Sequence, residues 1–145
     1  METNMDFVKD IELIQGRSTH KLAFRLDAFL RRTLDILAAL GGLLFLAPFF
    51  AVIAIVIRRD SPGPVFYRGP RVGLHGKEFG ILKFRTMYEC PESYAGSAVT
   101  TSGDSRITPL GRWLRDSKIN ELPQLWNVLV GEMSLVGPRP EDPKL

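Results

Sequence analysis

The dominant pattern of the chain is an apolar run over residues 36–57, in which none of the 22 residues is charged. A helix of this length reaches about 33 Å, which is enough to cross the hydrocarbon core of a bilayer. Buried helices of soluble proteins are usually shorter and keep a polar face. The run therefore predicts a helix that enters a membrane.

Pro48 lies near the middle of this run, and basic residues flank both ends. Proline removes a backbone donor and clashes with the carbonyl one turn earlier, so we expect the helix to kink or break there. Arg31 and Arg32 precede the run and Arg58 and Arg59 follow it, and positive charge prefers the cytoplasmic side of a membrane. The pattern favours a re-entrant helix–break–helix hairpin with both ends in the cytoplasm over a single kinked span.

The segment before the apolar run has a weaker pattern. Residues 1–16 indicate a short helix or a disordered arm. Over residues 21–32 apolar and basic positions alternate, which predicts an amphipathic helix at the level of the lipid headgroups. An ordinary helix that packs against a partner would have the same pattern. Acidic residues ahead of the apolar run argue against a cleaved signal peptide.

Two short apolar stretches, residues 65–68 and 79–84, have the composition of strands. A rigid Asp-Ser-Pro-Gly-Pro turn at 60–64 precedes the first strand, and a Gly-rich turn at 73–76 separates the two. We predict a β-hairpin, followed by a loop over residues 88–105, which are rich in Ser, Thr, Gly and Pro.

Two helices are expected in the last third of the chain. The first begins at Thr108, because threonine caps helix N-termini and the proline that follows is tolerated at the first helical position. Its pattern extends to about Ser117. The second is expected over residues 121–130, capped by Asn120 and closed by Gly131.

Trp113 and Trp126 lie on the apolar faces of these two helices. Each could anchor the protein at a membrane interface, but we predict that both pack in the core. Together the elements predict an α+β fold that is mainly helical, with a re-entrant membrane helix, interfacial amphipathic helices and a small β-hairpin. The expected parts are an N-terminal arm with its amphipathic helix (1–32), the membrane helix (33–59) and a cytoplasmic domain of catalytic type (60–145).

Composition narrows the function classes. The 145 residues have room for one domain, and the net charge of +3 suits an anionic membrane surface or a phosphate ligand. No nucleic-acid recognition motif occurs. A single cysteine, Cys90, excludes an internal disulfide framework, and His20 and His75 have no neighbouring ligands for a transition metal. The chain stops directly after a proline-rich turn, so we expect it to be truncated at its C-terminus.

The second half of the chain carries many cations and a few acids. Cations that clamp phosphates, with a carboxylate able to hold Mg²⁺ or attack phosphorus, are what phosphoryl transfer requires. Most surface arginines are merely solvated, so the composition alone is a weak signal. The residues concerned are Lys83, Arg85, Arg106, Arg112, Arg115, Lys118, Arg139, Asp104, Asp116, Glu121 and Glu132.

Several sequence blocks carry a much stronger signal, because their order and content resemble the bacterial sugar transferase family, the monotopic phosphoglycosyl transferases. The resemblance covers residues 31–140. The blocks are Asp-Ser-Pro-Gly-Pro-Val-Phe-Tyr at 60–67, Arg-Val-Gly at 71–73, Leu-Lys-Phe-Arg-Thr-Met at 82–87, Arg-Ile-Thr at 106–108, Gly-Arg at 111–112, Glu-Leu-Pro-Gln-Leu-Trp-Asn-Val at 121–128 and Met-Ser-Leu-Val-Gly-Pro-Arg-Pro at 133–140.

The resemblance implies transfer of a sugar 1-phosphate from a UDP-sugar to a polyprenyl phosphate such as undecaprenyl phosphate. It implies Mg²⁺ as cofactor and a location at the cytoplasmic face of the bacterial inner membrane. Such reactions start the synthesis of exopolysaccharides and other glycoconjugates. Family members enter the membrane by a re-entrant helix that is broken near a proline, which matches Pro48. The oligomeric state, homomeric or heteromeric, stays open.

The family's catalytic centre is an Asp-Glu pair, in which the aspartate attacks the β-phosphate of the UDP-sugar and forms a covalent phosphosugar–enzyme. Here Asn120 stands at the position of the aspartate, and only Glu121 of the pair, also the implied metal ligand, remains. An amide cannot form the acyl phosphate. Asn120 is therefore an engineered replacement, or the mark of a natural branch in which Glu121 or another acid acts, or the mark of a silent member that works as a binding or partner subunit.

Four further positions match phosphate-binding positions of the family: Lys83, Arg85, Arg115 and Arg139. For each of them a purely structural ion pair is the alternative. Asp104 and Arg106 match another family motif, whose role the resemblance does not define.

Overall fold

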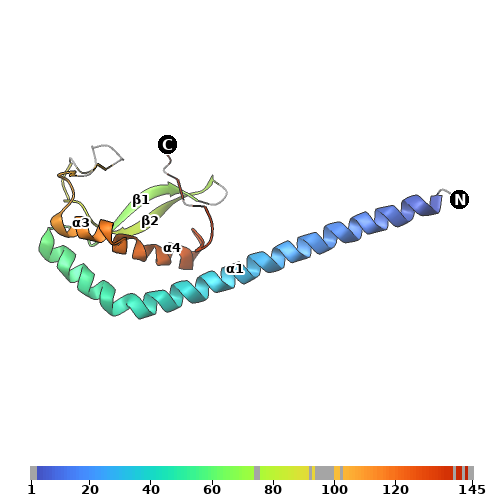
Figure 1. Cartoon of the computed structure of the whole chain (residues 1–145), viewed down its shortest axis with the longest axis horizontal. Helices are drawn as coiled ribbons and strands as arrows, with labels where there is room; N and C mark the ends of the chain where they lie inside the picture. The colour runs from blue at the N-terminus through green and yellow to red at the C-terminus, as the bar shows by residue number, and fades with distance from the viewer. Residues whose placement is uncertain are drawn as a thin grey trace.

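The computed structural model describes residues 3–73, 76–91, 93, 100–101, 103–138, 140–141 and 143, with side chains from Arg25 onward. The described part is mostly helical with one small antiparallel sheet, as the sequence predicts, and Figure 1 shows α3 and α4 between that sheet and the long helix α1. The elements are α1 (Thr3–Asp60), β1 (Phe66–Val72), β2 (Glu78–Phe84), α3 (Pro109–Asp116), the 3₁₀-helix η2 (Ile119–Gln124) and α4 (Leu125–Val130).

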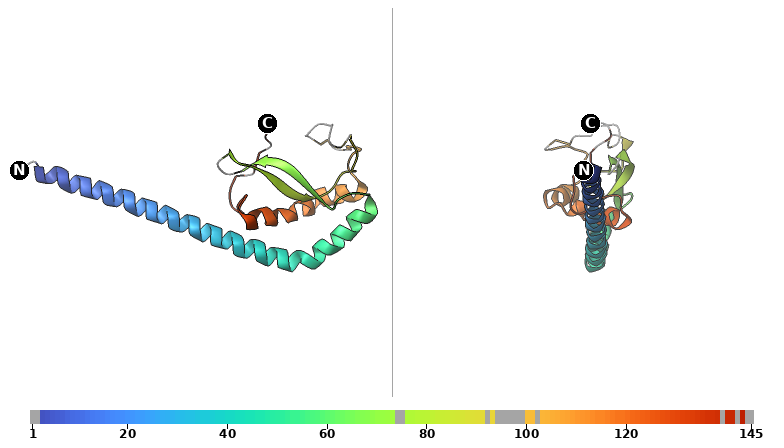
Figure 2. Two further views of the ribbon diagram at one scale, coloured as in Figure 1. Left: turned by 180° about the vertical axis from the view of Figure 1, so that it is seen from behind. Right: turned by 90° about the vertical axis from the view of Figure 1, so that its right-hand side faces the viewer.

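Helix α1 is one continuous helix and not a series of segments. It runs through residues 3–16, for which a short helix or a disordered arm is expected, and it crosses position 32 without interruption. It also continues through Pro48, although Figures 1 and 2 show that it bends in the region that carries this residue. The missing donor and the bulk of the proline ring open the helix on one side, which bends it without ending it. The kink is present, and the expected break is absent.

The apolar run is not a core helix of the globular part. Residues 25–60 of α1 contain a window of mean hydropathy 2.7, of which only 11% is buried, and within the described residues α1 alone is long and apolar enough to cross a membrane. Large apolar side chains such as Leu44 and Phe45 are exposed. This exposed, contiguous apolar surface has the length and composition that the predicted entry into a membrane requires.

The C-terminal arm of α1 packs on the globular part through a buried apolar cluster. Ile53 and Ile57 form a buried cluster with Phe84 at the end of β2 and Leu114 of α3. The ring of Phe50 meets that of Phe84 edge-on, with 5.2 Å between their centroids. This contact joins the apolar helix α1 to the sheet and to α3.

The predicted hairpin is confirmed, and β1 is longer than expected because it continues through Pro70. Pro70 pairs with Gly80, whose carbonyl oxygen points away from β1 and accepts from Nδ2 of Asn127 (2.9 Å). The proline nitrogen therefore faces the outer edge, where no ladder bond is lost. Oδ1 of the same asparagine accepts from the backbone N–H of Leu82 (2.9 Å), so this buried amide of α4 takes the place of a third strand at the edge of β2.

Helix α3 begins as predicted. Thr108 caps it, with Oγ1 accepting from the backbone N–H of Gly111 (2.8 Å). The core prediction for Trp113 and Trp126 is wrong: 51% and 45% of their surfaces are exposed. The interior positions are taken instead by Leu114 and other smaller side chains, and both indoles lie outside them.

The second predicted helix is divided into η2 and α4, which changes the role expected for Asn120. Lys118, in the left-handed conformation (φ 61°), precedes η2, and Asn120 lies inside this 3₁₀-helix and not at its cap. The prediction that Gly131 ends the segment is confirmed, with φ 91°. The N–H groups of Gly131 and Glu132 return to the carbonyl oxygens of Val128 and Asn127, which is a Schellman motif.

Candidate active site

Asn120 and Glu121 are adjacent on η2 but lie in different environments. Asn120 is only 9% exposed, and its Oδ1 has no hydrogen-bond partner within the described part of the chain. Nε2 of Gln124, one helical turn further, is also buried without a partner there. An unsatisfied buried polar atom costs about 1–3 kcal/mol, so a pair of them in one turn marks a place where a ligand or a side-chain rearrangement would be favourable.

Glu121 is paired with Lys83 of β2, with 2.8 Å between Oε1 and Nζ. The structure thus brings together two residues that the sequence separates by 38 positions, both predicted as site residues. Both side chains are partly buried, and an ion pair of this kind is worth at most about 1 kcal/mol of stability. Because the ion pair lies beside Asn120, it matters more as a part of the candidate site than as a contribution to stability.

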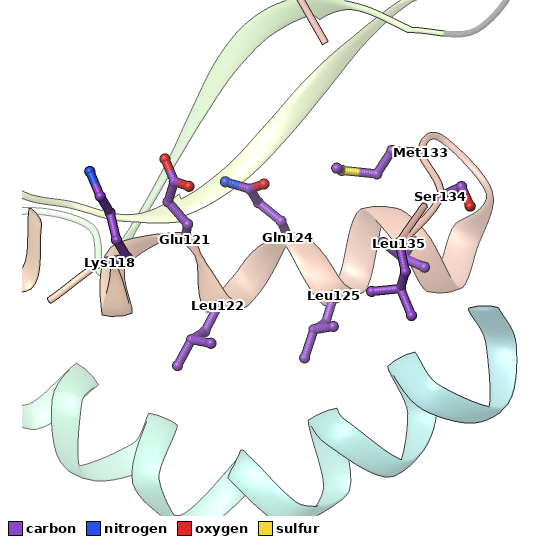
Figure 3. Close-up of a pocket in the computed structure, with 9 residues that line it drawn as sticks. Lys118, Glu121, Leu122, Gln124, Leu125, Met133, Ser134 and Leu135 are labelled. Carbon is purple, nitrogen blue, oxygen red and sulfur yellow. The ribbon is translucent and has the colours of Figure 1, made fainter. Parts of the chain in front are cut away.

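An open pocket of about 270 Å³ lies beside this pair. Figure 3 shows that Lys118, Glu121 and Gln124 point toward the side of the sheet, whereas Leu122 and Leu125 point toward α1. One rim of the pocket is therefore polar and the other is apolar. Its lining residues are Lys118, Glu121, Leu122, Gln124, Leu125, Val128, Met133, Ser134 and Leu135.

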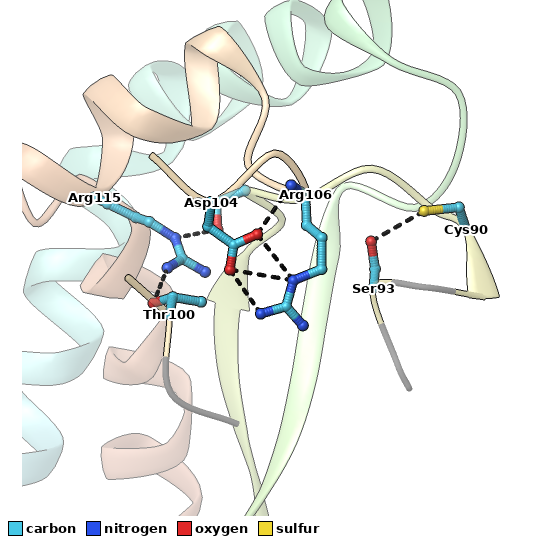
Figure 4. Close-up of polar contacts among 7 residues, drawn as sticks. Cys90, Ser93, Thr100, Asp104, Arg106 and Arg115 are labelled. Carbon is cyan, nitrogen blue, oxygen red and sulfur yellow. Dashed lines mark hydrogen bonds and ion pairs between the residues drawn. The ribbon is translucent and has the colours of Figure 1, made fainter. Parts of the chain in front are cut away.

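A second polar cluster surrounds Arg115 at the end of α3 (Figure 4). Nε and Nη1 of Arg115 donate to Oγ1 of Thr86 and Oγ1 of Thr100, each at 2.8 Å. Burial lowers the pKa of this guanidinium, because desolvation disfavours the charged form, although it stays protonated at neutral pH. Arg115 is thus held in a defined orientation by two hydroxyls.

Asp104 and Arg106 form the ion pair beside Arg115. Both carboxylate oxygens of Asp104 accept from Arg106, with 2.6 Å between Oδ2 and Nη2. Oδ1 of Asp104 also accepts from the backbone N–H of Arg106 (3.0 Å). The side-chain hydrogen bonds, and after them this backbone bond, lower the pKa of Asp104 to about 2. The side-chain bond to the carboxylate also raises the pKa of Arg106. The motif therefore forms a rigid charged turn ahead of α3.

Arg85 lies elsewhere, at the C-terminal end of α1. Its guanidinium is buried and donates to the carbonyl oxygens of Pro62 (2.5 Å), Ser61 (2.6 Å) and Ile57 (3.4 Å) and to Oγ of Ser61. These contacts give Arg85 a structural role, and binding of phosphate by this residue stays a prediction. Arg139 lies outside the described residues.

Two buried polar residues near the pocket were not predicted from the sequence. Asn127 is fully buried at the edge of β2, and Asp35 is a buried acid one residue ahead of the apolar run. The available signal in both cases was a polar residue in an otherwise apolar helical face, which is costly to bury unless it is hydrogen-bonded. Within the described residues no group of three or more His, Cys, Asp or Glu side chains could hold a metal ion by itself.

Comparison with known proteins adds a family to this geometry. A family model described as bacterial sugar transferase matches residues 26–145. The chain is 45% identical over 118 residues to the undecaprenyl-phosphate glucose phosphotransferase of Komagataeibacter xylinus, which covers 81% of the chain and 22% of that protein. It is 44% identical over 140 residues to the UDP-N-acetylgalactosamine-undecaprenyl-phosphate N-acetylgalactosaminephosphotransferase of Aeromonas hydrophila, which covers 97% of the chain and 33% of that protein.

A third relative is the exopolysaccharide production protein PSS of Rhizobium leguminosarum bv. phaseoli. It is 46% identical over 114 residues, which cover 79% of the chain and 57% of that protein. The chain thus spans less than two thirds of the length of each of these curated relatives.

Proposed function

The chain belongs to the bacterial sugar transferase family, and on this basis we propose that it transfers a sugar 1-phosphate from a UDP-sugar to a polyprenyl phosphate such as undecaprenyl phosphate. The product would start the synthesis of an exopolysaccharide or another glycoconjugate. The observation that carries the proposal is the ion pair of Lys83 with Glu121, because Glu121 lines a pocket whose other rim faces the apolar helix α1. A polar centre beside a membrane-entering helix suits a reaction between a soluble donor and a lipid acceptor.

The proposed location is the cytoplasmic face of the bacterial inner membrane, which α1 enters as a re-entrant hairpin. Both ends of the apolar run are attached to the same globular part: Arg32 donates to carbonyl oxygens of α4, and Ser61 accepts from Arg85. A straight span would separate the two ends by about 30 Å of hydrocarbon. The common attachment and the bend supplied by Pro48 support the hairpin over the single span.

In this reaction the cations neutralise phosphate charge. Lys83 and Arg115 present a compact ammonium and an oriented guanidinium, which are the groups that stabilise a phosphoryl group in transfer. The residues present fit Mg²⁺, which proteins hold through one or two carboxylates together with substrate phosphates. Glu121, which lines the pocket, would hold it. When bound, Mg²⁺ would offset the charge of the diphosphate.

Asn120 decides between two forms of the proposal. A covalent phosphosugar on the enzyme requires a carboxylate nucleophile, and the side chain at position 120 is an amide. Either Glu121 or another acid acts in its place, or the chain is a silent member of the family that binds ligands or pairs with an active partner. The amide of Asn120 has no anionic oxygen with which to attack phosphorus, which favours the silent form.

One assay separates these forms. The purified protein is incubated with a UDP-sugar, undecaprenyl phosphate and Mg²⁺, and UMP release is measured beside Asn120→Asp and Glu121→Gln. UMP release by the unchanged protein would exclude the silent form, and its loss in Glu121→Gln would assign Glu121 to the reaction. Activity that appears only in Asn120→Asp would support the silent form. If no protein of the set releases UMP, the transferase function is wrong for this chain.

The hairpin has its own test. Single cysteines replace Arg25 and Arg59 in a Cys90→Ser background, and both are exposed to a membrane-impermeant thiol reagent added from the cytoplasmic side. The hairpin predicts labelling at both positions. Labelling at only one of them would mean that α1 spans the membrane.

A further inference from the structure

Two charged side chains at the start of the apolar run hold α1 against the part of the molecule that carries the candidate site. Nη1 of Arg32 donates to the carbonyl oxygen of Val128 (2.6 Å), and Nη2 donates to that of Leu129 (2.7 Å). About one turn further along α1, Oδ1 of Asp35 accepts from the backbone N–H of Leu135 (3.1 Å). One turn of α1 therefore contacts both the end of α4 and the segment that follows it.

Gly131 makes this contact possible. A Cβ atom at this position would lie 3.2 Å from Nη2 of Arg32, which is closer than most side chains tolerate. The left-handed turn at Gly131 also leaves carbonyl oxygens of the last helical turn facing outward, and that of Val128, which already accepts from the N–H of Gly131, can accept from a further donor. Arg32 supplies that donor from a different element, 96 residues away in the sequence.

Asp35 is also in an unusual place. It is 7% exposed, one residue before the run that enters the membrane. A carboxylate in such a position is costly unless it accepts hydrogen bonds, and the N–H of Leu135 supplies one. The two side chains thus bind the main chain in opposite senses, Arg32 as donor and Asp35 as acceptor.

The residues that they bind are walls of the pocket. Val128 and Leu135 both line it, together with Glu121. Leu125, another wall residue, contacts α1 at Gly42, where a Cβ atom would lie 3.0 Å from Cδ1 of the leucine. Any shift of α1 relative to α4 would therefore move the walls of the pocket that holds Glu121.

We propose that Arg32 and Asp35 are positioning residues, which set the height of the candidate site relative to the apolar run and so align it with the phosphate of a lipid acceptor. The proposal rests on the proposed function. The nucleotide sugar is soluble and reaches the site from water, whereas the acceptor phosphate is confined to the surface of the bilayer. Loss of the two contacts should therefore affect the lipid substrate and leave the nucleotide sugar unaffected.

The chain offers a matched control, because Arg31 carries the same charge on the same flank. Its Nε pairs with Oδ2 of Asp27 (2.8 Å), and both side chains are exposed. Arg31→Ala removes a cation from the membrane flank without touching α4. A general effect of flank charge on membrane binding would appear equally in Arg31→Ala and Arg32→Ala.

The variants are assayed in nanodiscs by UMP release, in the Asn120→Asp background if only that background transfers. In Arg32→Ala and Asp35→Ala we expect the KM for undecaprenyl phosphate to rise about tenfold, with the KM for the UDP-sugar unchanged. Asp35→Asn keeps an acceptor oxygen and should restore most of the loss. Equal values for Arg32→Ala and Arg31→Ala, or equal changes for both substrates, would overturn the proposal.

Hydrogen exchange of the same proteins gives a readout that does not depend on activity. The amide of Leu135 should exchange faster in Asp35→Ala than in the unchanged protein and in Arg31→Ala. Unchanged exchange at Leu135 would overturn the proposed contact even if activity fell. If no variant transfers at all but the exchange changes as expected, the proposed function fails and the attachment of α1 stands.

Discussion

Lys83 and Arg85 are two residues apart in one sequence block, yet they belong to two different regions of the molecule. Lys83 is partly exposed and faces a single carboxylate, that of Glu121. Arg85 is buried, and its donors are directed at main-chain oxygens at the end of α1. A cation with several neutral acceptors holds a fold together, whereas a cation opposite one carboxylate on an open pocket can exchange that partner for a phosphate.

The comparison predicts the largest effect on stability at Arg85. Arg85→Ala would leave the carbonyl oxygens of Ser61 and Pro62 buried without a donor, at a cost of about 3 kcal/mol of unfolding free energy. Thermal unfolding of the protein in detergent would measure this cost. Arg85→Lys should recover only part of it, because one ammonium cannot reproduce the planar set of donors. A fully stable Arg85→Ala protein that binds UDP-sugar poorly would reverse the assignment.

Lys83 should give the opposite result. Lys83→Met, made in the Asn120→Asp background if only that background transfers, is expected to lower UMP release about 100-fold through loss of phosphate neutralisation. The unfolding free energy should change by less than about 1 kcal/mol, because the pair with Glu121 is partly exposed. Activity and thermal unfolding are measured on the same preparation. A large loss of stability with activity retained would move Lys83 into the structural class with Arg85.

Arg115 should lie between these two cases. It is half buried and held by the hydroxyls of Thr86 and Thr100, so Arg115→Ala is expected to cost about 1 kcal/mol of stability and about tenfold in kcat/KM for the UDP-sugar. Thr86→Val removes one of its acceptors and leaves the cation. Its effect on kcat/KM should be smaller than that of Arg115→Ala. An equal effect would mean that orientation, and not charge, is what Arg115 contributes.

The smallest effect is expected from Asp104 and should depend on pH. Because Arg106 lowers the pKa of Asp104 from 3.8 to about 2, the ionised carboxylate is favoured in the folded protein. This contribution to stability is complete above pH 3.8 and is lost as the pH falls toward 2. Asp104→Asn should be less stable than the unchanged protein at pH 7, and the difference should vanish near pH 2. A difference that is constant with pH would contradict the ion-pair origin.

Much of the local structure could be predicted from the sequence because local chemistry decides it. Thr108 caps α3, Gly131 ends α4, and the hairpin forms where the strand patterns and the Gly-rich turn predict it. Whether the helix breaks or only bends at Pro48 was not predictable in the same way. A proline bends or ends a helix according to what the two arms pack against, and here the C-terminal arm is held by the sheet and α3.

The candidate site could be predicted only in part. The sequence blocks identify Lys83, Glu121 and Arg115, but the block that holds Lys83 also holds Arg85, and no sequence pattern separates their roles. The position of Asn120 inside η2 could not be predicted either, because an asparagine before a helical pattern is typical of a helix cap. For Asn127, the only sign in the sequence of a structural role is that an amide lies on an otherwise apolar helix face.

By itself the sequence determined the apolar helix, the hairpin, the helix ends and the family, since each depends on short-range pattern or on ordered blocks. Only the tertiary structure decided which cations face main-chain oxygens and which face a carboxylate beside the pocket, because that depends on what lies opposite each side chain. Arg32 meets α4 across 96 residues of sequence, and Lys83 meets Glu121 across 38. Such contacts are set by how α1 and the sheet pack on α4 and η2, and no local pattern records that packing.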